Sequence, residues 1–246
     1  MDDDQEQPAA RRQSGDLLAA LPSGLIPARA PLEGEAVRLE PIDPARHADE
    51  LYASSHGVSG GEAIWQFLSY GPWSGMDAFR TWLRDCAAFQ DPIFYAIRDG
   101  ATGKACGMAS YLNIVPKNGS IEIGHIWFAP ALQRTRAATE ALYLLLRYAL
   151  DELKYRRMEW KCDALNAPSR RAARRLGFRF EGIFFQHMIV KGKNRDTAWY
   201  SIMDHEWPAI RATMELWLAT GNFDSGGRQK RSLGDIIRDS PAGDVR

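Results

Sequence analysis

Two strand-like runs joined by a tight turn, a third strand-like run and a long amphipathic helix leave few folds open to this chain. Residues 93–97 and 105–112 are mostly apolar, and the polar, glycine-containing segment between them predicts a β-hairpin. Residues 120–128 form a further run, and residues 135–153 repeat apolar side chains at helical spacing. Because hairpins join some neighbouring strands while helices separate others, the pattern predicts an α+β fold. Its central sheet should be mixed, mostly antiparallel and flanked by helices, rather than doubly wound.

Other segments extend this pattern. Further strands are expected at residues 36–41, 158–162, 179–190 and 197–203, and further helices at residues 74–89 and from Asn166 to Gly177. In the first of these helices, Ser74 and Asp77 have the spacing of a capping box. We interpret residues 34–210 as one domain, residues 1–33 as a polar N-terminal tail that packs at most through residues 17–21, and residues 211–246 as a C-terminal helix and polar tail.

Composition excludes several classes of protein. Hydrophobic residues make up 45% of the chain and include 8 Trp and 10 Phe, so a disordered chain is excluded because these side chains need a core. No apolar run approaches the roughly 20 residues of a membrane span. The 31 basic and 31 acidic residues balance, which argues against broad binding to nucleic acid or to an anionic membrane.

The cysteines and the N-terminus indicate a compartment. Cys86, Cys106 and Cys162 are odd in number and far apart, so the sequence supports neither a disulfide framework nor a zinc site, and no metal is expected. The first residues, M-D-D-D-Q-E-Q, are acidic where a signal peptide is basic and then apolar. We therefore expect a cytoplasmic protein with reduced thiols.

The junction between residues 120–128 and the following helix gives the first indication of function. The loop from Gln133 to Ala138 leads directly into the helix, whose first backbone N–H groups have no intrahelical partners. These groups and the helix dipole attract anions, and a diphosphate fits there. Such loops occur in every protein that alternates strands with helices. An ordinary helix start bonded to water is therefore the plainer interpretation of this geometry.

Four motifs favour the functional interpretation. They are I-E-I-G-H-I-W-F, Q-R-T-R-A-A-T-E-A-L, N-A-P-S-R-R and L-G-F-R-F-E-G, and they follow one another in this order. Together they resemble the GNAT N-acetyltransferases, and more narrowly the Rim-type branch that contains the ribosomal-protein N-terminal acetyltransferases. The resemblance covers residues 34–205. It implies the GNAT fold and the transfer of an acetyl group from acetyl-CoA, as cosubstrate, to a primary amine.

The resemblance also implies how acetyl-CoA is held. Backbone groups around Trp127 and Phe128 would pair with the pantetheine arm like an added strand. The family's diphosphate loop reads Gln/Arg-x-x-Gly-x-Gly/Ala, so Gln133 and Ala138 match while Arg136 replaces a glycine. The residues expected around the diphosphate are Gln133, Arg134, Thr135, Arg136, Ala137 and Ala138. The replacement implies either an outward arginine that helps to bind a phosphate, or weaker binding of the cofactor, or none.

Residues of the third motif are implied as further contacts. Asn166 would bond the pantetheine arm, and Ser169 is a candidate of the same kind, although Asn166 also fits the N-cap of the helix that follows it. The rings of Trp127 and Phe128 are expected in the core more than on the ligand. The arginines of this helix fit a solvated face, a contact with the 3′-phosphate of CoA or, least well, a nucleic-acid patch; they are Arg170, Arg171, Arg174 and Arg175.

Glu122 is the expected catalytic base. An amine with a pKa of about 8–10 is mostly protonated at pH 7, so it must lose a proton before it attacks a thioester. Alternation places Glu122 on the sheet face opposite Ile121 and Ile123, and in the family that face often lines the substrate cleft. An ordinary exposed carboxylate is the alternative. The same alternation places His125 with Ile123, as a partly buried structural histidine.

Other catalytic roles are implied only in outline. Many enzymes of this fold use a tyrosine as the acid for the leaving thiolate, and that position is Ala173 here, so water is expected to supply the proton. A backbone N–H at Trp127 or Phe128 would polarise the thioester carbonyl. His187 and Tyr111 are expected to border the substrate cleft.

The acceptor stays open between a protein N-terminus and a small-molecule amine. Loops at residues 54–73 and 184–195 would wall the cleft, and the aromatic rings of the first loop either select a flat acceptor or, as we favour, pack the domain. The expected partners are this acceptor and, as an option, further copies of the chain, but no membrane and no nucleic acid. The alternative functions are a non-catalytic protein of the same fold that binds or senses CoA and, more distantly, an interaction protein that recruits a partner through its tails.

Overall fold

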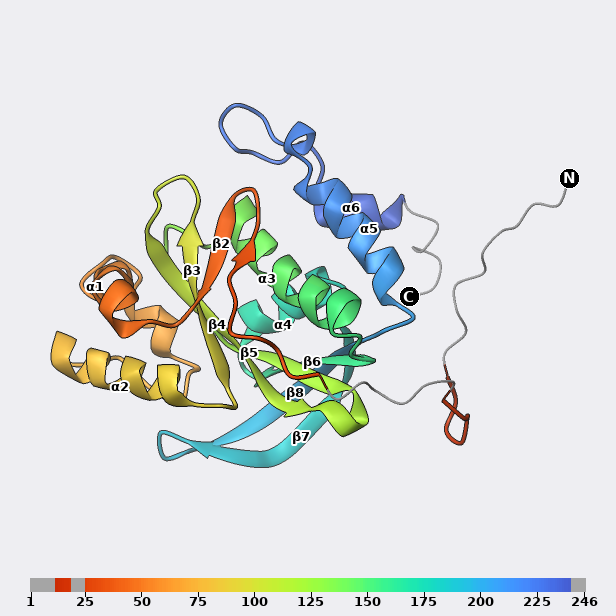
Figure 1. Cartoon of the computed structure of the whole chain (residues 1–246), viewed down its shortest axis with the longest axis horizontal. Coiled ribbons are helices and arrows are strands. Elements are labelled where there is room, and N and C mark those ends of the chain that lie inside the picture. Colours follow the sequence, from red (N-terminus) through yellow and green to blue (C-terminus); the bar gives the residue numbers. More distant parts are fainter. Residues whose placement is uncertain (1–11, 19–24, 240–246) are drawn as a thin grey trace, which may run out of the picture.

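The computed structural model describes residues 12–18 and 25–239, which build an eight-stranded sheet (Figure 1). The strand order is β1-β2-β3-β4-β5-β6-β8-β7. The strands are β1 (Leu32–Glu33), β2 (Val37–Pro41), β3 (Ile93–Asp99), β4 (Ala105–Val115), β5 (Ser120–Phe128), β6 (Arg157–Asp163), β7 (Arg179–Val190) and β8 (Lys193–Met203). Neighbouring strands are antiparallel except β5 and β6, which are parallel. The expected mixed, mostly antiparallel sheet is therefore confirmed.

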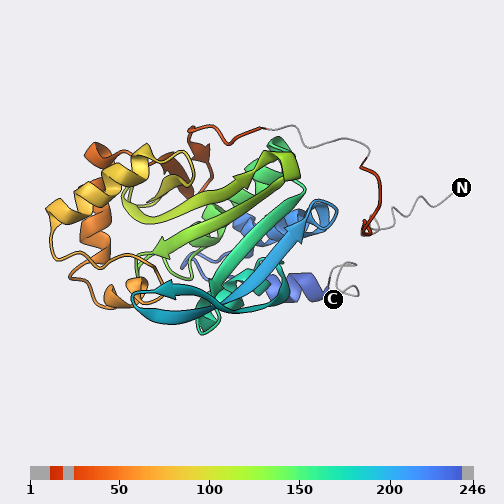
Figure 2. The same ribbon diagram turned by 90° about the horizontal axis from the view of Figure 1, so that it is seen from below.

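Helices cover both faces of this sheet (Figures 1 and 2). The helices α1 (Pro44–Ser55) and α2 (Met76–Ala88), with the 3-10 turn η1 (Glu62–Trp65) between them, pack on one face, which we call the α1–α2 face. The opposite face, called the α3 face, carries α3 (Arg136–Arg147), α4 (Ala167–Arg175), α5 (Trp207–Leu218) and α6 (Leu233–Arg238). Among the residues described, no helix combines the length and the apolar character needed to cross a membrane.

β5 contributes side chains to both apolar layers. Ile121 and Ile123 are buried beneath α3, whereas Trp127 is buried with Met108 of β4 against α1 and α2. The long helix expected over residues 135–153 ends as an α-helix at Arg147 and continues as a π-helical turn, Tyr148–Glu152. These layers hold β5 at the centre of the sheet, where the functional motifs begin.

The two predicted helix starts have different outcomes. The prediction of a capping box at Ser74 and Asp77 is wrong, because α2 begins at Met76 with Gly75 at the N-cap and no side chain caps it. Asn166, in contrast, is the N-cap of α4, and its Oδ1 accepts from the Ser169 N–H at 3.1 Å. Gly177, with φ +97°, follows the end of α4 as expected.

The N-terminal segment is tied to the sheet at its end. Leu32–Glu33 pairs with β2, and the Ala28 backbone bonds the hydroxyls of Tyr95 and Tyr148, both at 3.0 Å. In the apolar stretch expected to pack, Leu17 is 98% exposed and Leu18 is half-buried, and residues 19–21 lie outside the described residues. The part of this segment nearest the domain thus continues the sheet.

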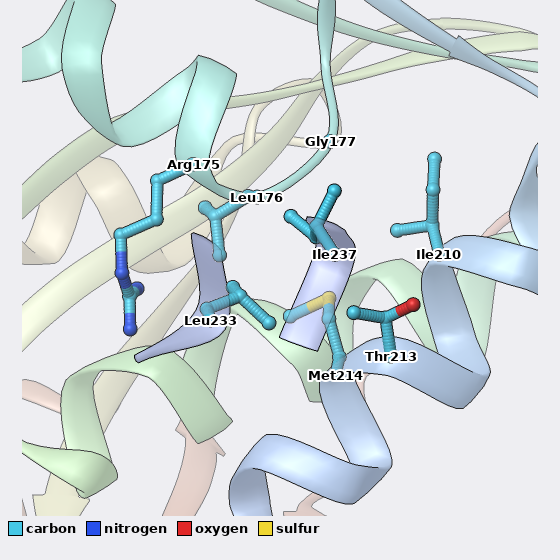
Figure 3. A pocket seen from close by; sticks show the side chains of 8 residues that line it. All are labelled: Arg175, Leu176, Gly177, Ile210, Thr213, Met214, Leu233 and Ile237. Atoms are coloured by element: carbon cyan, nitrogen blue, oxygen red, sulfur yellow. The ribbon is translucent and has the colours of Figure 1, made fainter. Parts of the chain in front are cut away.

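The polar stretch after residue 222 carries a docked helix. Ser232 and Asp235 form a capping box at the start of α6, and Leu233 and Ile236 are buried. Figure 3 shows a small hollow between α6, α5 and the end of α4, with Leu233 and Met214 among its mostly apolar lining. Its free space is about that of one water molecule, so the hollow is a packing defect rather than a substrate site.

Candidate active site

The sheet opens between its two parallel strands. β5 pairs with β6 only from Ser120 to Glu122, although β5 runs on to Phe128. Past Phe128, the Ala129 N–H donates to Cys106 O on the β4 side, so alternation turns the N–H and C=O of Phe128 toward the open side. The second half of β5 therefore presents backbone groups that β6 does not pair with.

A β-bulge in β5 overturns the expected orientation of His125. The register with β4 shifts between Met108 and Ser110, and His125 has a φ of +50°, so strict alternation breaks at this point. His125 lies on the α1–α2 face, where its Nδ1 is 3.3 Å from the Tyr70 hydroxyl and its ring packs on Phe94. It does not share a face with Ile123. Burial, aided by the charge of Arg195, lowers the pKa of His125 to about 4, so the ring is neutral at pH 7.

The start of α3 leaves three backbone N–H groups without protein acceptors among the residues described: those of Arg134, Arg136 and Ala137. Thr135 is the N-cap, and its Oγ1 accepts from the Ala138 N–H at 3.1 Å. Arg134 has a φ of +62°, which shapes the turn into the helix. An anion can bind here, because unpaired N–H groups and the helix dipole converge.

The Arg136 side chain is engaged by protein groups. Its Nε donates to Leu218 O at 2.8 Å, its Nη2 bonds Glu35 Oε2 at 2.5 Å, and the guanidinium lies over the ring of Phe223. The arginine that replaces a glycine in the expected loop thus connects α3 to the end of α5 and to the β1–β2 turn. Its backbone N–H stays free while its guanidinium is occupied.

Asn166 and Ser169 both serve the packing of α4. Besides the N-cap bond from Asn166, the Ser169 Oγ accepts from Trp160 Nε1 at 3.0 Å. Asn166 Nδ2 has no acceptor among the described residues, so this amide keeps a free donor. Ala173, which occupies the position of the family's tyrosine acid, is fully buried, and its methyl side chain cannot donate a proton.

Glu122 is buried in a small charged cluster. Its carboxylate accepts from Asn113 Nδ2 at 2.6 Å and from Lys161 Nζ at 2.8 Å, and Lys161 also bonds Glu159 at 2.8 Å. Only 4% of Glu122 is exposed, so the interpretation as an ordinary exposed carboxylate is wrong. Burial raises the pKa of Glu122, while Lys161 and Asn113 oppose that rise in part. Lys161 lies over the Trp199 ring, 4.0 Å from its centroid.

Sequence reasoning missed Asn113, Lys161 and Glu159. Alternation in β6 was a usable signal for two of them, because Met158, Trp160 and Cys162 are buried on the α3 face and turn the residues between them to the opposite face. No comparable signal existed for Asn113, which has a φ of +47° at a second irregularity of β4.

The β7–β8 hairpin lies beside this cluster. His187 Nδ1 is 3.0 Å from Thr197 Oγ1, and both Phe184 and His187 pack on Trp199. At the hairpin tip, Lys191 Nζ donates to Trp65 O at 2.9 Å, and Figure 2 shows the tip beside η1. The structure therefore brings His187 near the Glu122 cluster, through Trp199.

The expectation for Tyr111 is wrong. Its side chain is fully buried on the α3 face, and its hydroxyl donates to Leu145 O inside α3. Tyr111 pairs with Ile123 across β4 and β5, and this register places it on the face opposite Glu122. It is a core residue.

Three of the four rings of the aromatic loop pack the domain, as favoured. Trp65 is buried, and Tyr70 and Trp73 pack against the same apolar layer beneath α1 and α2. Three of the four α4 arginines also have protein partners: Arg170 Nε donates to the Tyr200 hydroxyl, Arg175 Nη1 donates to Thr139 Oγ1, and Arg174 lies over the Phe180 ring. No group of three metal-ligating side chains occurs within residues 12–18 and 25–239.

Known proteins share this architecture. The family model described as "Acetyltransferase (GNAT) domain" matches residues 36–179, more than half of the chain. A GCN5-related N-acetyltransferase from Brucella melitensis is 48% identical, with a TM-score of 0.83, over 85% of this chain and 95% of that one. A probable GNAT-family acetyltransferase from Chromobacterium violaceum is 44% identical, with a TM-score of 0.74, over 81% and 98%. The protein named "Putative ribosomal N-acetyltransferase YdaF" from Bacillus subtilis is 29% identical over 69% of this chain and 90% of its own length.

Proposed function

This chain belongs to the GNAT acetyltransferase family and is an N-acetyltransferase, and from that premise we propose how it binds acetyl-CoA and activates its acceptor. The family uses acetyl-CoA as cosubstrate and transfers the acetyl group to an amine. In this chain the reaction is direct attack by a primary amine on the thioester. The acceptor nitrogen forms a bond to the acetyl carbon, the carbon–sulfur bond breaks, and the nitrogen loses its proton.

The diphosphate of acetyl-CoA binds at the start of α3. The observation that carries this assignment is the set of backbone N–H groups at Arg134, Arg136 and Ala137, for which the described part of the chain offers no acceptor. Gln133 Nε2 donates to Phe128 O at 3.0 Å and so connects this loop to the end of β5. Because Arg136 is occupied by Glu35 and Leu218, its side chain neither supplies a phosphate contact nor fills the site.

The pantetheine arm follows the open edge of β5. The backbone around Trp127 and Phe128 is free of β6, so an extended chain can add there as a strand does. The free Nδ2 of Asn166, just beyond the end of β6, supplies a further donor. A backbone N–H of this stretch polarises the thioester carbonyl, because it is fixed before the negative charge develops.

Glu122 accepts the proton of the amine, directly or through water. It lies on the α1–α2 face, next to the point where β5 leaves β6, and burial raises its pKa toward the range useful in a base. Lys161 and Asn113 hold the carboxylate in place. Since Ala173 offers no acid, water returns a proton to the leaving thiolate.

A protein N-terminus is the acceptor class that the similarity to known proteins supports. The name of the relative YdaF supports a protein N-terminus as acceptor, and a small-molecule amine presents the same nucleophile. We also propose a cytoplasmic location, which the three free cysteines support because disulfides are rare in reducing compartments.

Isothermal titration with acetyl-CoA tests the proposed site. Arg134→Glu places a negative charge beside the diphosphate, at an exposed side chain that contacts no partner among the described residues, and we expect it to weaken binding strongly. Arg84→Glu, on the exposed side of α2, is the charge-matched control and should bind like the native chain. Equal affinity of all three proteins would place the diphosphate elsewhere, and no binding at millimolar acetyl-CoA would refute the proposed function.

A further inference from the structure

Arg195 is a half-buried arginine without a partner. Its Nε is enclosed by protein, yet it donates to no acceptor, and no carboxylate lies within 4 Å of the guanidinium among the described residues. The comparably buried Arg98 and Arg157 each pair with two carboxylates. Leaving a partly desolvated guanidinium unpaired is costly, so the position is explained if a ligand supplies the acceptor.

The strand β8 directs Arg195 toward the proposed reaction site. Ala198, Tyr200 and Ile202 are buried on the α3 face, so alternation turns Arg195, Thr197 and Trp199 to the α1–α2 face. Trp199 lies against Lys161, and Lys161 bonds Glu122. Arg195 is therefore two alternations along the same face from Trp199, which packs on the lysine that bonds the proposed base.

Arg195 also faces the bulge of β5. Its positive charge contributes to the lowered pKa of His125, the bulge residue of β5, although burial is the larger cause. β8 pairs with β6 only as far as Thr197 opposite Asp163, so Arg195 lies just beyond that pairing, beside the opening. Arg195 thus lies at the end of the sheet where β5 and β6 have already separated.

Four acidic side chains in this region already bond other protein groups. Asp196 turns to the other side and accepts from the Gln186 N–H and from Asn194 Nδ2. Asp91, which also acts on His125, accepts from the Ile114 N–H. Glu122 and Glu159 share Lys161. Within residues 12–18 and 25–239, no carboxylate forms an ion pair with Arg195.

The hairpin holds Arg195 in position from both ends. Arg195 pairs with Met188 on β7, and the tip of the hairpin is fixed by the bond from Lys191 Nζ to Trp65 O. A guanidinium on a strand supported in this way is suited to a planar, two-oxygen ligand group.

We propose that Arg195 binds a carboxylate of the acceptor, so that the preferred substrate is an amine that carries a carboxylate close to the nucleophilic nitrogen. The inference rests on the proposed function, because it assigns the acceptor of that same reaction. A free amino acid and a peptide with an acidic side chain next to its N-terminus both present this chemistry.

Acetyl transfer to matched pairs of acceptors tests the inference, with thiol release from acetyl-CoA as the signal. One arm compares L-amino acids with their α-amides, and the other compares tripeptides that carry Asp or Asn in second position. We expect the native chain to prefer the carboxylate in at least one arm. Arg195→Gln should raise KM for that acceptor and lower kcat/KM by about 10- to 100-fold, with the amide or Asn partner unaffected. Arg195→Lys should restore part of the preference.

A control variant on the same hairpin and three further outcomes complete the test. Lys193→Gln, an exposed lysine on the same hairpin, is the matched control and should keep the full preference. Equal use of both members of every pair, or a preference that survives Arg195→Gln, overturns the inference while leaving the proposed function intact. Loss of acetyl-CoA affinity in Arg195→Gln without any change in acceptor preference would assign Arg195 to the cosubstrate and also overturn it. Absence of transfer to every amine would refute the proposed function and the inference with it.

Discussion

Two buried carboxylates on the α1–α2 face of the sheet have opposite surroundings. Glu40 on β2 is 2% exposed; it bonds His47 Nε2 at 2.8 Å and lies within ion-pair distance of Arg46 and Arg98. His47 Nδ1 accepts from the Asp43 N–H, so its Nε2 carries the proton that points to Glu40. Burial alone would raise the pKa of Glu40, but the His47 bond and the two arginine charges together lower it.

Glu122 is nearly as buried but has fewer cations around it. Its one cation, Lys161, is shared with Glu159, and its other donor, Asn113, is neutral. Burial therefore prevails, and the pKa of Glu122 is raised. The two surroundings make Glu40 an anion that its neighbours stabilise and Glu122 a group whose uptake of a proton burial favours. The first is suited to holding elements together and the second to catalysis.

The largest expected effect comes from replacing Glu122. Glu122→Gln keeps the shape and the bond from Asn113 but cannot accept a proton, so kcat/KM for acetyl transfer should fall by about 10² to 10⁴-fold. The unfolding free energy should change little, because burial already disfavours the charge and Lys161 keeps Glu159. Steady-state assays at pH 7 and thermal melts measure the two quantities. Native-like activity in the variant would remove Glu122 from the mechanism.

Replacing Glu40 should lower stability and leave acetyl transfer unchanged. Glu40→Gln leaves several cations facing a neutral amide, so we expect the unfolding free energy to fall by about 3 kcal/mol. Acetyl transfer per folded molecule should be preserved, because Glu40 is remote from the opening between β5 and β6. Urea denaturation of the native chain and the variant, run in parallel with the activity assay, separates the two effects.

The stability difference at Glu40 should depend on pH in a defined direction. A carboxyl whose folded pKa is lowered contributes stability above its unfolded pKa and loses it as the pH falls through the folded value. The gap between the native chain and Glu40→Gln should thus be full at pH 7 and close below the ordinary value of 4.5. A gap that widened on acidification would contradict the assignment of Glu40 as a permanent anion.

A smaller effect is expected at Arg136, which contacts neither carboxylate. Arg136→Ala removes the bonds to Leu218 O and Glu35, and the unfolding free energy should drop by about 1–2 kcal/mol. Affinity for acetyl-CoA should stay the same, because the backbone N–H of residue 136 remains. A large loss of acetyl-CoA affinity in a folded variant would instead mean that the Arg136 guanidinium of the native chain contacts a phosphate.

The regular elements were predictable because their causes are local. The turn between β3 and β4, the N-cap at Asn166 and the stop at Gly177 each follow from residues within a few positions of one another. The resemblance to the GNAT family then led to the correct fold and enzyme class.

The details of the site depend on contacts between distant segments. Strict alternation misplaced His125, because the bulge of β5 forms against β4 and leaves no mark in the sequence of β5 itself. Two other contacts also depend on distant segments: Glu122 bonds Lys161, 39 residues away, and Arg136 bonds Leu218, 82 residues away. Burial of Glu122 was therefore not predictable from the exposed or buried pattern of one strand.

The comparison between the two carboxylates can be measured directly by NMR titration of the chain labelled with ¹³C at the glutamate carboxyl groups. Glu122→Gln and Glu40→Gln assign the two resonances by their absence. We expect the Glu122 carboxyl to titrate above the ordinary value of 4.5 and the Glu40 carboxyl to titrate below it. A Glu122 carboxyl that titrates below 4.5 would mean that Lys161 holds it as a permanent anion, and would contradict its role as the base.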